Sequence, residues 1–177
     1  MHLPDGLRLE NLKYLAKGHH GKVFFIDNSR CIKIYKDKKY LKRELTNLKK
    51  AERKEGIFPK VYQRGKDYII LEYIDGIDLK KYLKSNPLTV SISRQLVDLI
   101  RNFKVIGYKR LDTSLTNVII TPNEILRPID PTSLMRFRQP YPKIMLKQLK
   151  QKGLKKNFLK HVKEIDQKLY KNWKRKH

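Results

Sequence analysis

The chain is poor in cysteine and in acidic residues. Cys31 is its only cysteine, so no internal disulfide can form and no cysteine cluster can hold zinc, which favours a reducing, cytoplasmic compartment. The five histidines lack a spacing that would aim two imidazoles at one metal ion. No run of about 18 apolar residues occurs, and the N-terminus lacks the basic-then-apolar pattern of a signal peptide. We therefore expect neither a transmembrane segment nor a metal site built from histidines.

The scarcity of acidic residues leaves a large positive charge. Against 42 Lys+Arg stand 17 Asp+Glu, a formal net charge of +25 over 177 residues. Such a charge attracts nucleic acid, nucleotide phosphates, anionic lipid or acidic protein surfaces, and by itself it does not choose among them. The hydrophobic content of 40% suffices for a packed core, and the length suits one domain, or one domain with a short appendage.

Residues 1–76 predict a small antiparallel sheet that carries one helix. Short apolar runs alternate with turn residues over residues 12–36, which is typical of a three-stranded meander. Apolar residues at helical spacing then predict an amphipathic helix from about Lys39 to Lys54. Two more apolar runs, at residues 61–62 and 68–73, complete the sheet as further strands.

Residues 77–177 predict a mostly helical second part, which makes the fold class α+β. A short helix is expected just after Asp78, and a longer one between the Pro87 turn and Gly107. Residues 118–121 and 126–129 read as a hairpin. Apolar residues then recur every three or four positions from Leu154 to Trp173, which predicts one C-terminal helix with a single apolar stripe.

Two glycines and a lysine in an apolar strand form the first candidate site, although a lysine in such a strand is normally exposed at an edge. In Ala16-x-Gly18-x-x-Gly21-x-Val23 the missing side chains would let backbone N–H groups approach a phosphate, although two glycines three apart are most often only a hairpin turn. Twelve residues after Gly21, Lys33 lies in an apolar strand. A carboxylate on the following helix, Glu44, could hold its ammonium group, although such pairs also arise by chance in so basic a chain.

The second candidate site flanks the hairpin. Asp112 and Asn117 stand five residues apart before it, and Asp130 follows it, thirteen residues after Asn117. Taken singly, the two aspartates could simply terminate secondary structure. Together with the glycines, Lys33 and Glu44, their order resembles the protein-kinase family.

The resemblance implies ATP and Mg²⁺ as cofactors and a role for each residue. Lys33 would contact the nucleotide phosphates, with Glu44 positioning it. Asp112 would orient the attacking hydroxyl, and Asn117 and Asp130 would bind Mg²⁺, whose preference is for hard oxygen ligands.

The same resemblance assigns the adenine pocket. Residues 69–76 resemble the strand and hinge of kinases, with Leu71 at the back of the pocket. The backbone of Glu72 and Ile74 would hydrogen-bond the base, and Val23 would cover its face. The nucleotide-binding set implied by the resemblance is Ala16, Gly18, Gly21, Val23, Lys33, Leu71, Glu72 and Ile74.

The sequence also departs from conventional kinases. Arg110-Leu111-Asp112 stands in place of His-Arg-Asp, Ser114 in place of a lysine, and Ile129-Asp130-Pro131 in place of Asp-Phe-Gly. These features resemble the small atypical Ser/Thr kinases of the RIO and tRNA-modification-complex type. Only 47 residues follow Asp130, so we expect no groove that grips a peptide without a partner. The expected activity is phosphate transfer to a protein or a small hydroxyl compound, autophosphorylation or ATP hydrolysis.

Two alternatives to an active kinase stay open. One is a pseudokinase, a scaffold that keeps the fold and binds nucleotide without transferring phosphate. The other is a basic nucleic-acid-binding protein whose kinase-like spacing is accidental. The Lys-rich C-terminal helix either only solubilises the fold or contacts RNA, an acidic protein surface or an anionic membrane surface, since residues 135–177 hold fifteen Lys+Arg and two acidic residues.

Overall fold

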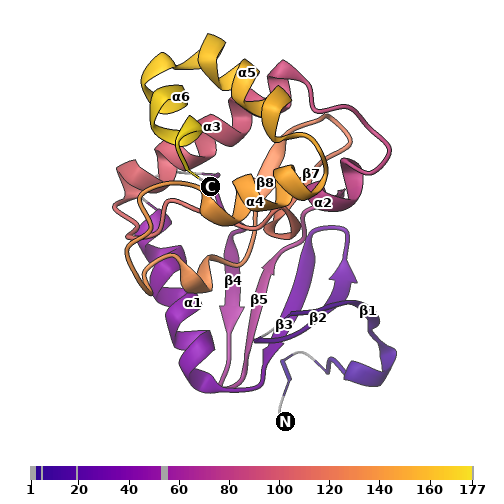
Figure 1. The fold of residues 1–177 in the computed structure, drawn as a ribbon. Coiled ribbons are helices and arrows are strands. Elements are labelled where there is room, and N and C mark those ends of the chain that lie inside the picture. Colours follow the sequence, from indigo (N-terminus) through magenta and orange to yellow (C-terminus); the bar gives the residue numbers. More distant parts are fainter. Residues whose placement is uncertain (1–2, 5, 19, 53–55, 177) are drawn as a thin grey trace. The chain divides into compact units, whose positions relative to one another are not determined.

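A computed structural model of the chain describes residues 3–4, 6–18, 20–52 and 56–176. The chain divides into two compact units, Met1–Asp75 and Gly76–His177 (Figure 1). None of the helices in the described ranges combines the length and apolar character needed to cross a bilayer.

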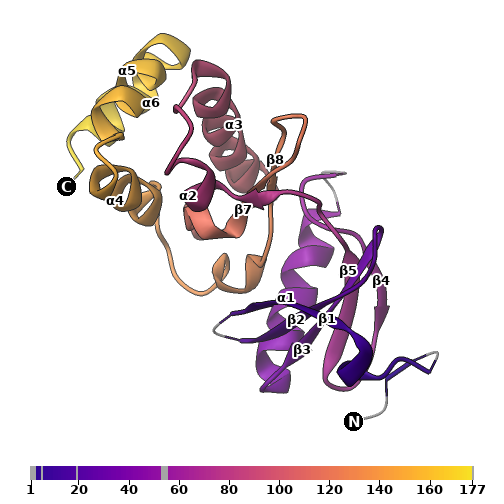
Figure 2. The ribbon, with the colours of Figure 1, turned by 90° about the vertical axis from the view of Figure 1, so that its right-hand side faces the viewer.

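The first unit is a five-stranded antiparallel sheet with one helix along a face (Figure 2). A short 3-10 turn, η1 (Leu9–Asn11), precedes it. The spatial order of the strands is β1-β2-β3-β5-β4. The meander, the helix and the two later strands expected from the sequence are confirmed. Their bounds are β1 (Lys13–Lys17), β2 (Gly21–Asp27), β3 (Arg30–Tyr35), α1 (Lys38–Ala51), β4 (Val61–Arg64) and β5 (Tyr68–Glu72).

The two faces of this sheet bury different sets of residues. On one face Ile32, Tyr68 and Ile70 form a buried cluster, covered by apolar residues of the N-terminal segment and of β2 and β3. Helix α1 begins where the Asp37 side chain accepts a hydrogen bond from the amide of Lys39, and its buried positions recur at helical spacing. Lys33 follows Ile32 in β3, so its side chain lies on the opposite face of the sheet. Because Glu44 of α1 contacts Lys33, α1 packs on that opposite face.

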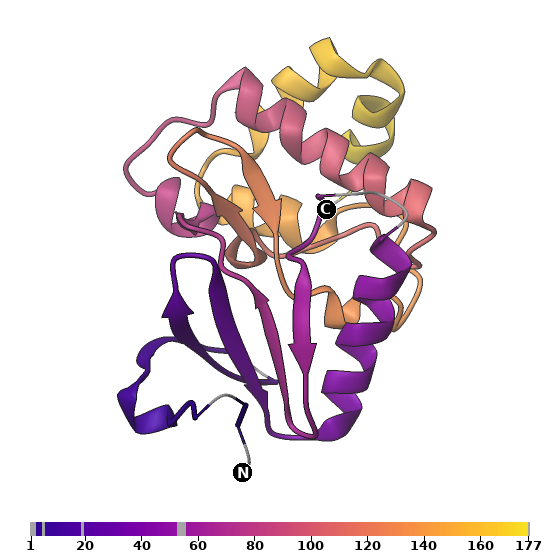
Figure 3. The same ribbon diagram turned by 180° about the vertical axis from the view of Figure 1, so that it is seen from behind.

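The second unit joins a small sheet to a set of helices. The strands β6, β7 and β8 pair antiparallel in that order. Helix α5 packs against α3, with α6 following it (Figure 3). The bounds are β6 (Ile77–Asp78), α2 (Leu79–Tyr82), α3 (Val90–Ile106), η2 (Leu115–Asn117), β7 (Val118–Ile120), β8 (Leu126–Pro128), η3 (Pro131–Ser133), α4 (Lys143–Gln151), α5 (Lys155–Ile165) and α6 (Gln167–Lys174).

Helix α3 has local signals at both ends, and the prediction of its position is confirmed. The Thr89 hydroxyl accepts a hydrogen bond from the amide of Ile92, which satisfies one of the unpaired donors of the first turn. Gly107 ends the helix in the left-handed conformation, with a φ of 80°, where glycine carries no Cβ penalty.

The prediction of a single C-terminal helix is wrong. Two helices, α5 and α6, meet at Asp166, whose extended backbone (φ −159°, ψ 100°) interrupts the first and opens the second. The Asp166 carboxylate accepts a hydrogen bond from the amide of Leu169 and pairs with Arg101 at 2.7 Å. These contacts, with the Leu169 hydrogen bond foremost, lower the pKa of Asp166. A charged cap therefore outweighs the apolar periodicity that runs through this position.

Candidate functional site

A row of paired residues crosses the sheet of the first unit. Ala16 of β1 pairs with Val23 of β2, Val23 pairs with Lys33 of β3, and Lys33 pairs with Ile69 of β5. Residues directly opposite each other in antiparallel strands project to the same face. A β-bulge in β1 between Tyr14 and Ala16 shifts the register, and this shift places Ala16 opposite Val23.

Leu71 belongs to the same face as this row. It lies two residues beyond Ile69 in β5 and pairs with Cys31, which lies two residues before Lys33 in β3. Side chains two positions apart in a strand share a face. The structure thus brings four of the residues assigned to a nucleotide, Ala16, Val23, Lys33 and Leu71, to one face of the sheet.

A buried ion pair fixes the lysine of this row. The Lys33 Nζ lies 2.5 Å from the Glu44 Oε2, and the two side chains are only 8% and 2% exposed. The ammonium also lies 5.2 Å from the centroid of the Tyr35 ring. A buried ammonium held at one place on a sheet can meet an anionic group of a ligand with little further loss of side-chain entropy. The roles of both residues toward a nucleotide stay a prediction.

Cys31, beside Lys33 on this face, is unsuited to nucleophilic chemistry. Burial raises the pKa of its thiol to about 11, an effect that the Lys33 charge only partly opposes. The thiolate is the reactive form of cysteine, so at neutral pH this side chain is a small packing residue.

The segment after β5 leaves one backbone donor open. The amide of Glu72 donates to the carbonyl of Lys60, and the amide of Tyr73 donates to the carbonyl of Ser29. The carbonyl of Glu72 has the Cys31 thiol at 3.8 Å. Within the described part of the chain, the amide of Ile74 has no hydrogen-bond partner. Of the backbone groups assigned to an adenine base, the Ile74 amide is therefore the one that is ready to donate.

The two glycines of the β1–β2 turn differ in what they require. A Cβ on Gly21 would lie 1.9 Å from the carbonyl oxygen of Ile34, so the pairing of β2 with β3 already demands glycine there. A Cβ on Gly18 would have nothing nearer than the Gly21 carbonyl oxygen at 3.9 Å. Packing within the described residues therefore explains the glycine at position 21 but not the one at position 18. A substitution at Gly18 is thus the better test of whether a ligand approaches this turn.

This contrast predicts different outcomes for two alanine variants. Gly21→Ala should lower the free energy of unfolding by about 2 kcal/mol or more, because backbone must move to admit the methyl group. Gly18→Ala should leave stability within about 0.5 kcal/mol of the wild type while weakening ATP binding. Thermal unfolding and ATP titration by calorimetry measure the two effects. Unchanged ATP affinity in a well-folded Gly18→Ala protein would remove Gly18 from the nucleotide site.

In the second unit, Asp112 caps a helix that has no cap of its own. Helix α4 begins after Pro142, which offers no capping side chain. Instead Asp112 accepts hydrogen bonds from the amide of Ile144 at 2.9 Å and from that of Met145 at 3.3 Å. The Arg110 guanidinium also lies 3.4 Å from the carboxylate. Asp112 thus satisfies first-turn donors that would otherwise lack a partner.

The burial of Asp112 changes its acidity. The residue is 1% exposed, and burial raises the pKa of its carboxyl group above the usual value. The two amide donors and Arg110 act in the opposite direction and only partly offset the burial. The resemblance to kinases predicted that Asp112 orients the attacking hydroxyl. The structure adds a second role, the capping of α4, which no local sequence pattern indicated.

Gln148 of α4 is a site residue that the sequence analysis missed. Its side-chain oxygen accepts a hydrogen bond from the amide of Leu115 at 2.7 Å, and its amide nitrogen donates to the Ser114 hydroxyl at 2.9 Å. Together with Asp112, it fastens the loop of residues 112–117 to α4. A glutamine in a basic helix carries no motif, so its sequence held no signal for this role.

Asn117 and Asp130 are neighbours in the structure. The amide of Ile129 donates to the carbonyl of Asn117 at 2.8 Å, which joins the two ends of the β7–β8 hairpin. Asp130 adopts a left-handed backbone, with a φ of 53° and a ψ of 70°, and its carboxylate accepts hydrogen bonds from the amide and hydroxyl of Thr132. This conformation costs a non-glycine residue about 1 kcal/mol, and such strain is concentrated at functional sites.

The donor set of this pair suits Mg²⁺. An amide oxygen and a carboxylate are hard ligands, and Mg²⁺ commonly binds one or two protein groups together with waters and substrate phosphates. In the described ranges no group of three or more His, Cys, Asp or Glu could hold a metal ion. Asn117 and Asp130 would therefore share an ion with a phosphate-bearing ligand rather than bind it alone.

Comparison with known proteins bears on the fold. No family model matches the chain. A cysteine-to-alanine mutant of the PknI kinase domain of Mycobacterium tuberculosis is similar, with a TM-score of 0.53 and 18% identity over 75% of this chain and 63% of that one. The unmutated PknI kinase domain gives a TM-score of 0.53 and 17% identity over 74% and 63%. This chain thus spans under two thirds of either neighbour's length. Its α+β fold is that of a protein-kinase-like domain.

Proposed function

We propose that the chain is a minimal ATP- and Mg²⁺-dependent phosphotransferase of the Ser/Thr protein-kinase type. The observation that carries this proposal is the buried Lys33–Glu44 pair, in line with Ala16 and Val23 on one sheet face. Apolar side chains of similar volume would often stabilise such a position as well or better. A fixed ammonium is then best explained by a ligand that needs it, and the phosphates of a nucleotide are such a ligand.

The second unit supplies the remaining groups in this proposal. Asp112 accepts the proton of the attacking hydroxyl, and the raised pKa that burial gives its carboxyl group suits a proton acceptor. Asn117 and Asp130 hold Mg²⁺, which when bound neutralises charge on the transferred phosphate. The attacking hydroxyl belongs to a protein serine or threonine or to a small hydroxyl compound. Ser114 and the Ile129-Asp130-Pro131 segment support a subtype similar to the RIO and tRNA-modification-complex kinases.

The test is transfer of label from γ-labelled ATP in the presence of Mg²⁺. The full chain is incubated alone and with a generic basic protein, beside Asp112→Asn and the control Asp98→Asn, which removes an exposed carboxylate of α3. We expect label in the wild type and in the control, and a loss of at least about a thousandfold in Asp112→Asn. Label that persists in folded Asp112→Asn would show that Asp112 is not the proton acceptor.

A second candidate, a nucleotide-binding scaffold without transfer activity, is favoured by one specific observation. Both carboxylate oxygens of Asp112 are engaged by the first turn of α4, and the side chain is almost fully buried. A residue so occupied has less access to a substrate hydroxyl. ATP binding that depends on Mg²⁺, without transfer of label by the wild type, would favour this candidate.

The basic surface of the two last helices is the proposed contact for a polyanion. Helices α5 and α6 expose lysines such as Lys156, Lys163 and Lys171. Phosphate-rich RNA or an acidic protein surface would complement this face through interactions that weaken with salt.

A further inference from the structure

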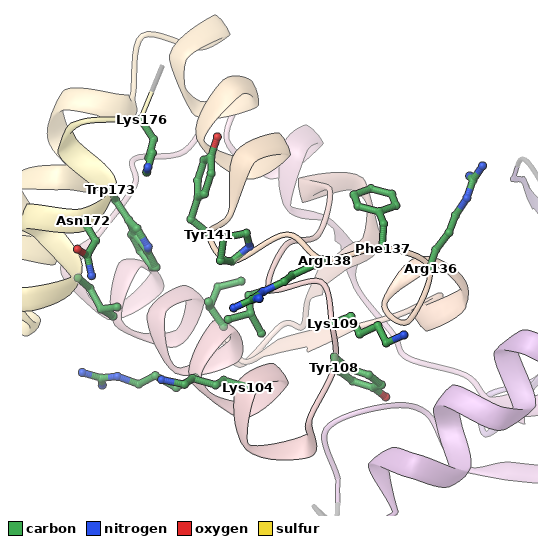
Figure 4. Close-up of a pocket in the computed structure, with 15 residues that line it drawn as sticks. Lys104, Tyr108, Lys109, Arg136, Phe137, Arg138, Tyr141, Asn172, Trp173 and Lys176 are labelled. Carbon is green, nitrogen blue, oxygen red and sulfur yellow. The ribbon is translucent and has the colours of Figure 1, made fainter.

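A pocket of about 820 Å³ lies within the second unit. Its walls come from the end of α3, the residues that follow α3, the loop of residues 136–141, and α6. In Figure 4 the Arg138 side chain crosses the middle of the pocket, while Asn172 and Trp173 project from α6 at one side. Segments far apart in the sequence therefore build one concave surface.

The lining is strongly cationic. Six of its residues are lysine or arginine, and the described lining contains no aspartate or glutamate. Arg101 is neutralised by Asp98 and Asp166 at 2.9 and 2.7 Å. The other five form no ion pair with any carboxylate of the described chain. They are Lys104, Lys109, Arg136, Arg138 and Lys176. Like charges gathered around one cavity repel one another, so an anionic ligand would relieve this repulsion.

Aromatic rings stand among these cations. Phe137 lies between two arginines in the sequence and is 46% exposed, so its ring is accessible to a ligand. The guanidinium of Arg110 lies 5.1 Å from the centroid of the Phe137 ring, and the ammonium of Lys176 lies 5.5 Å from that of Tyr141. Trp173, by contrast, is buried and stacks on Phe158, so it serves the core. Phe137 and Tyr141 are the rings that a ligand can reach.

We propose that this pocket binds single-stranded nucleic acid without sequence preference. A single strand carries both features that the lining complements, since its phosphates match the unpaired cations and its bases offer planar faces to Phe137 and Tyr141. An acidic peptide matches only the cations and leaves the exposed Phe137 without a counterpart. A duplex keeps its bases stacked inside and so presents no face to these rings.

The experiment is a titration of fluorescein-labelled 12-nucleotide oligouridylate and oligothymidylate with the full chain, followed by fluorescence anisotropy at several salt concentrations. The pocket variant is Lys109→Gln/Arg138→Gln. The control is Lys80→Gln/Lys84→Gln, which removes the same charge from exposed positions in and just after α2, outside both the pocket and the last helices. We expect the pocket variant to weaken binding at least about tenfold and to reduce the slope of log affinity against log salt by about 1.4, and the control to weaken it less than about twofold.

A third variant isolates stacking from charge. Phe137→Leu keeps an apolar side chain at an exposed position, so its fold should persist, as circular dichroism would verify. Loss of one stacked base predicts a decrease in affinity of about fivefold or more. Binding of either oligonucleotide with these losses supports the proposal. The proposal would be overturned if the pocket and control variants lost affinity equally, or if Phe137→Leu bound with unchanged affinity. It would also be overturned if polyglutamate competed as well as the oligonucleotides do.

Discussion

Replacing Asp112 with alanine is expected to destabilise the second unit by about 1–3 kcal/mol, because the first-turn amides of α4 lose their acceptor in a buried setting. Asp112→Asn keeps one acceptor oxygen in a side chain of similar shape, so it should lower the free energy of unfolding by less than Asp112→Ala does. Urea unfolding at pH 7 measures both changes. The fluorescence of Trp173, the only tryptophan and a buried one, reports on this unit. An alanine variant as stable as the wild type would contradict the capping role.

The pH dependence of the same variants has a defined sign. Burial raises the pKa of the Asp112 carboxyl group, so the folded state binds this proton more tightly than the unfolded state does. The contribution of Asp112 to stability therefore falls as pH rises from about 3.9, the unfolded value, through the raised folded pKa. Asp112→Asn lacks this proton. Its stability relative to the wild type should improve from pH 3.5 to pH 7, and a constant difference over that range would contradict the assignment.

Removal of one partner of the Lys33–Glu44 pair is expected to have a still larger effect. Glu44→Ala leaves a buried ammonium without its carboxylate, and such losses amount to about 3–5 kcal/mol. Asp98→Ala is the control, because it breaks an exposed pair with Arg101 and should cost no more than about 0.5 kcal/mol. Denaturant unfolding followed by circular dichroism measures both. A cost for Glu44→Ala as small as that of the control would contradict the burial of the pair.

The double variant Lys33→Met/Glu44→Leu separates structure from function. Both charges leave together, so the protein should be as stable as the wild type or more stable. It should nevertheless lose measurable ATP binding in calorimetry if Lys33 contacts the phosphates. A stable double variant that binds ATP as tightly as the wild type would remove Lys33 from the proposed site.

Sequence patterns predicted the elements whose signals are local. The strands of the first unit follow alternating apolar runs and turns, and α3 carries Thr89 and Gly107 at its ends. Helix α4 was missed because its cap, Asp112, lies 30 residues before Pro142, where no local pattern points to it. The break at Asp166 was missed because the apolar period continues through it.

The residues proposed for the candidate sites could be named from the sequence, but their arrangement could not. The order of Lys33, Glu44 and Asp112 could be read from the sequence, whereas the row through Ala16 depends on a β-bulge that has no sequence signature. Composition likewise predicted a polyanion partner, which stays a prediction, and the lysines of the last helices suggested where it would bind. The pocket around Arg138 needs three distant segments folded together, so no linear pattern could indicate it.

The attachment of the 112–117 loop to α4 sets a limit on how far the chain can be shortened. Asp112 and Gln148 connect a central loop to a helix near the C-terminal end, and the Ser93 hydroxyl lies 2.8 Å from His161 of α5. Residues late in the chain therefore act as an internal scaffold for residues in its middle. Truncation before Lys143 would remove that scaffold and leave Asp112 in a site with nothing to hold it.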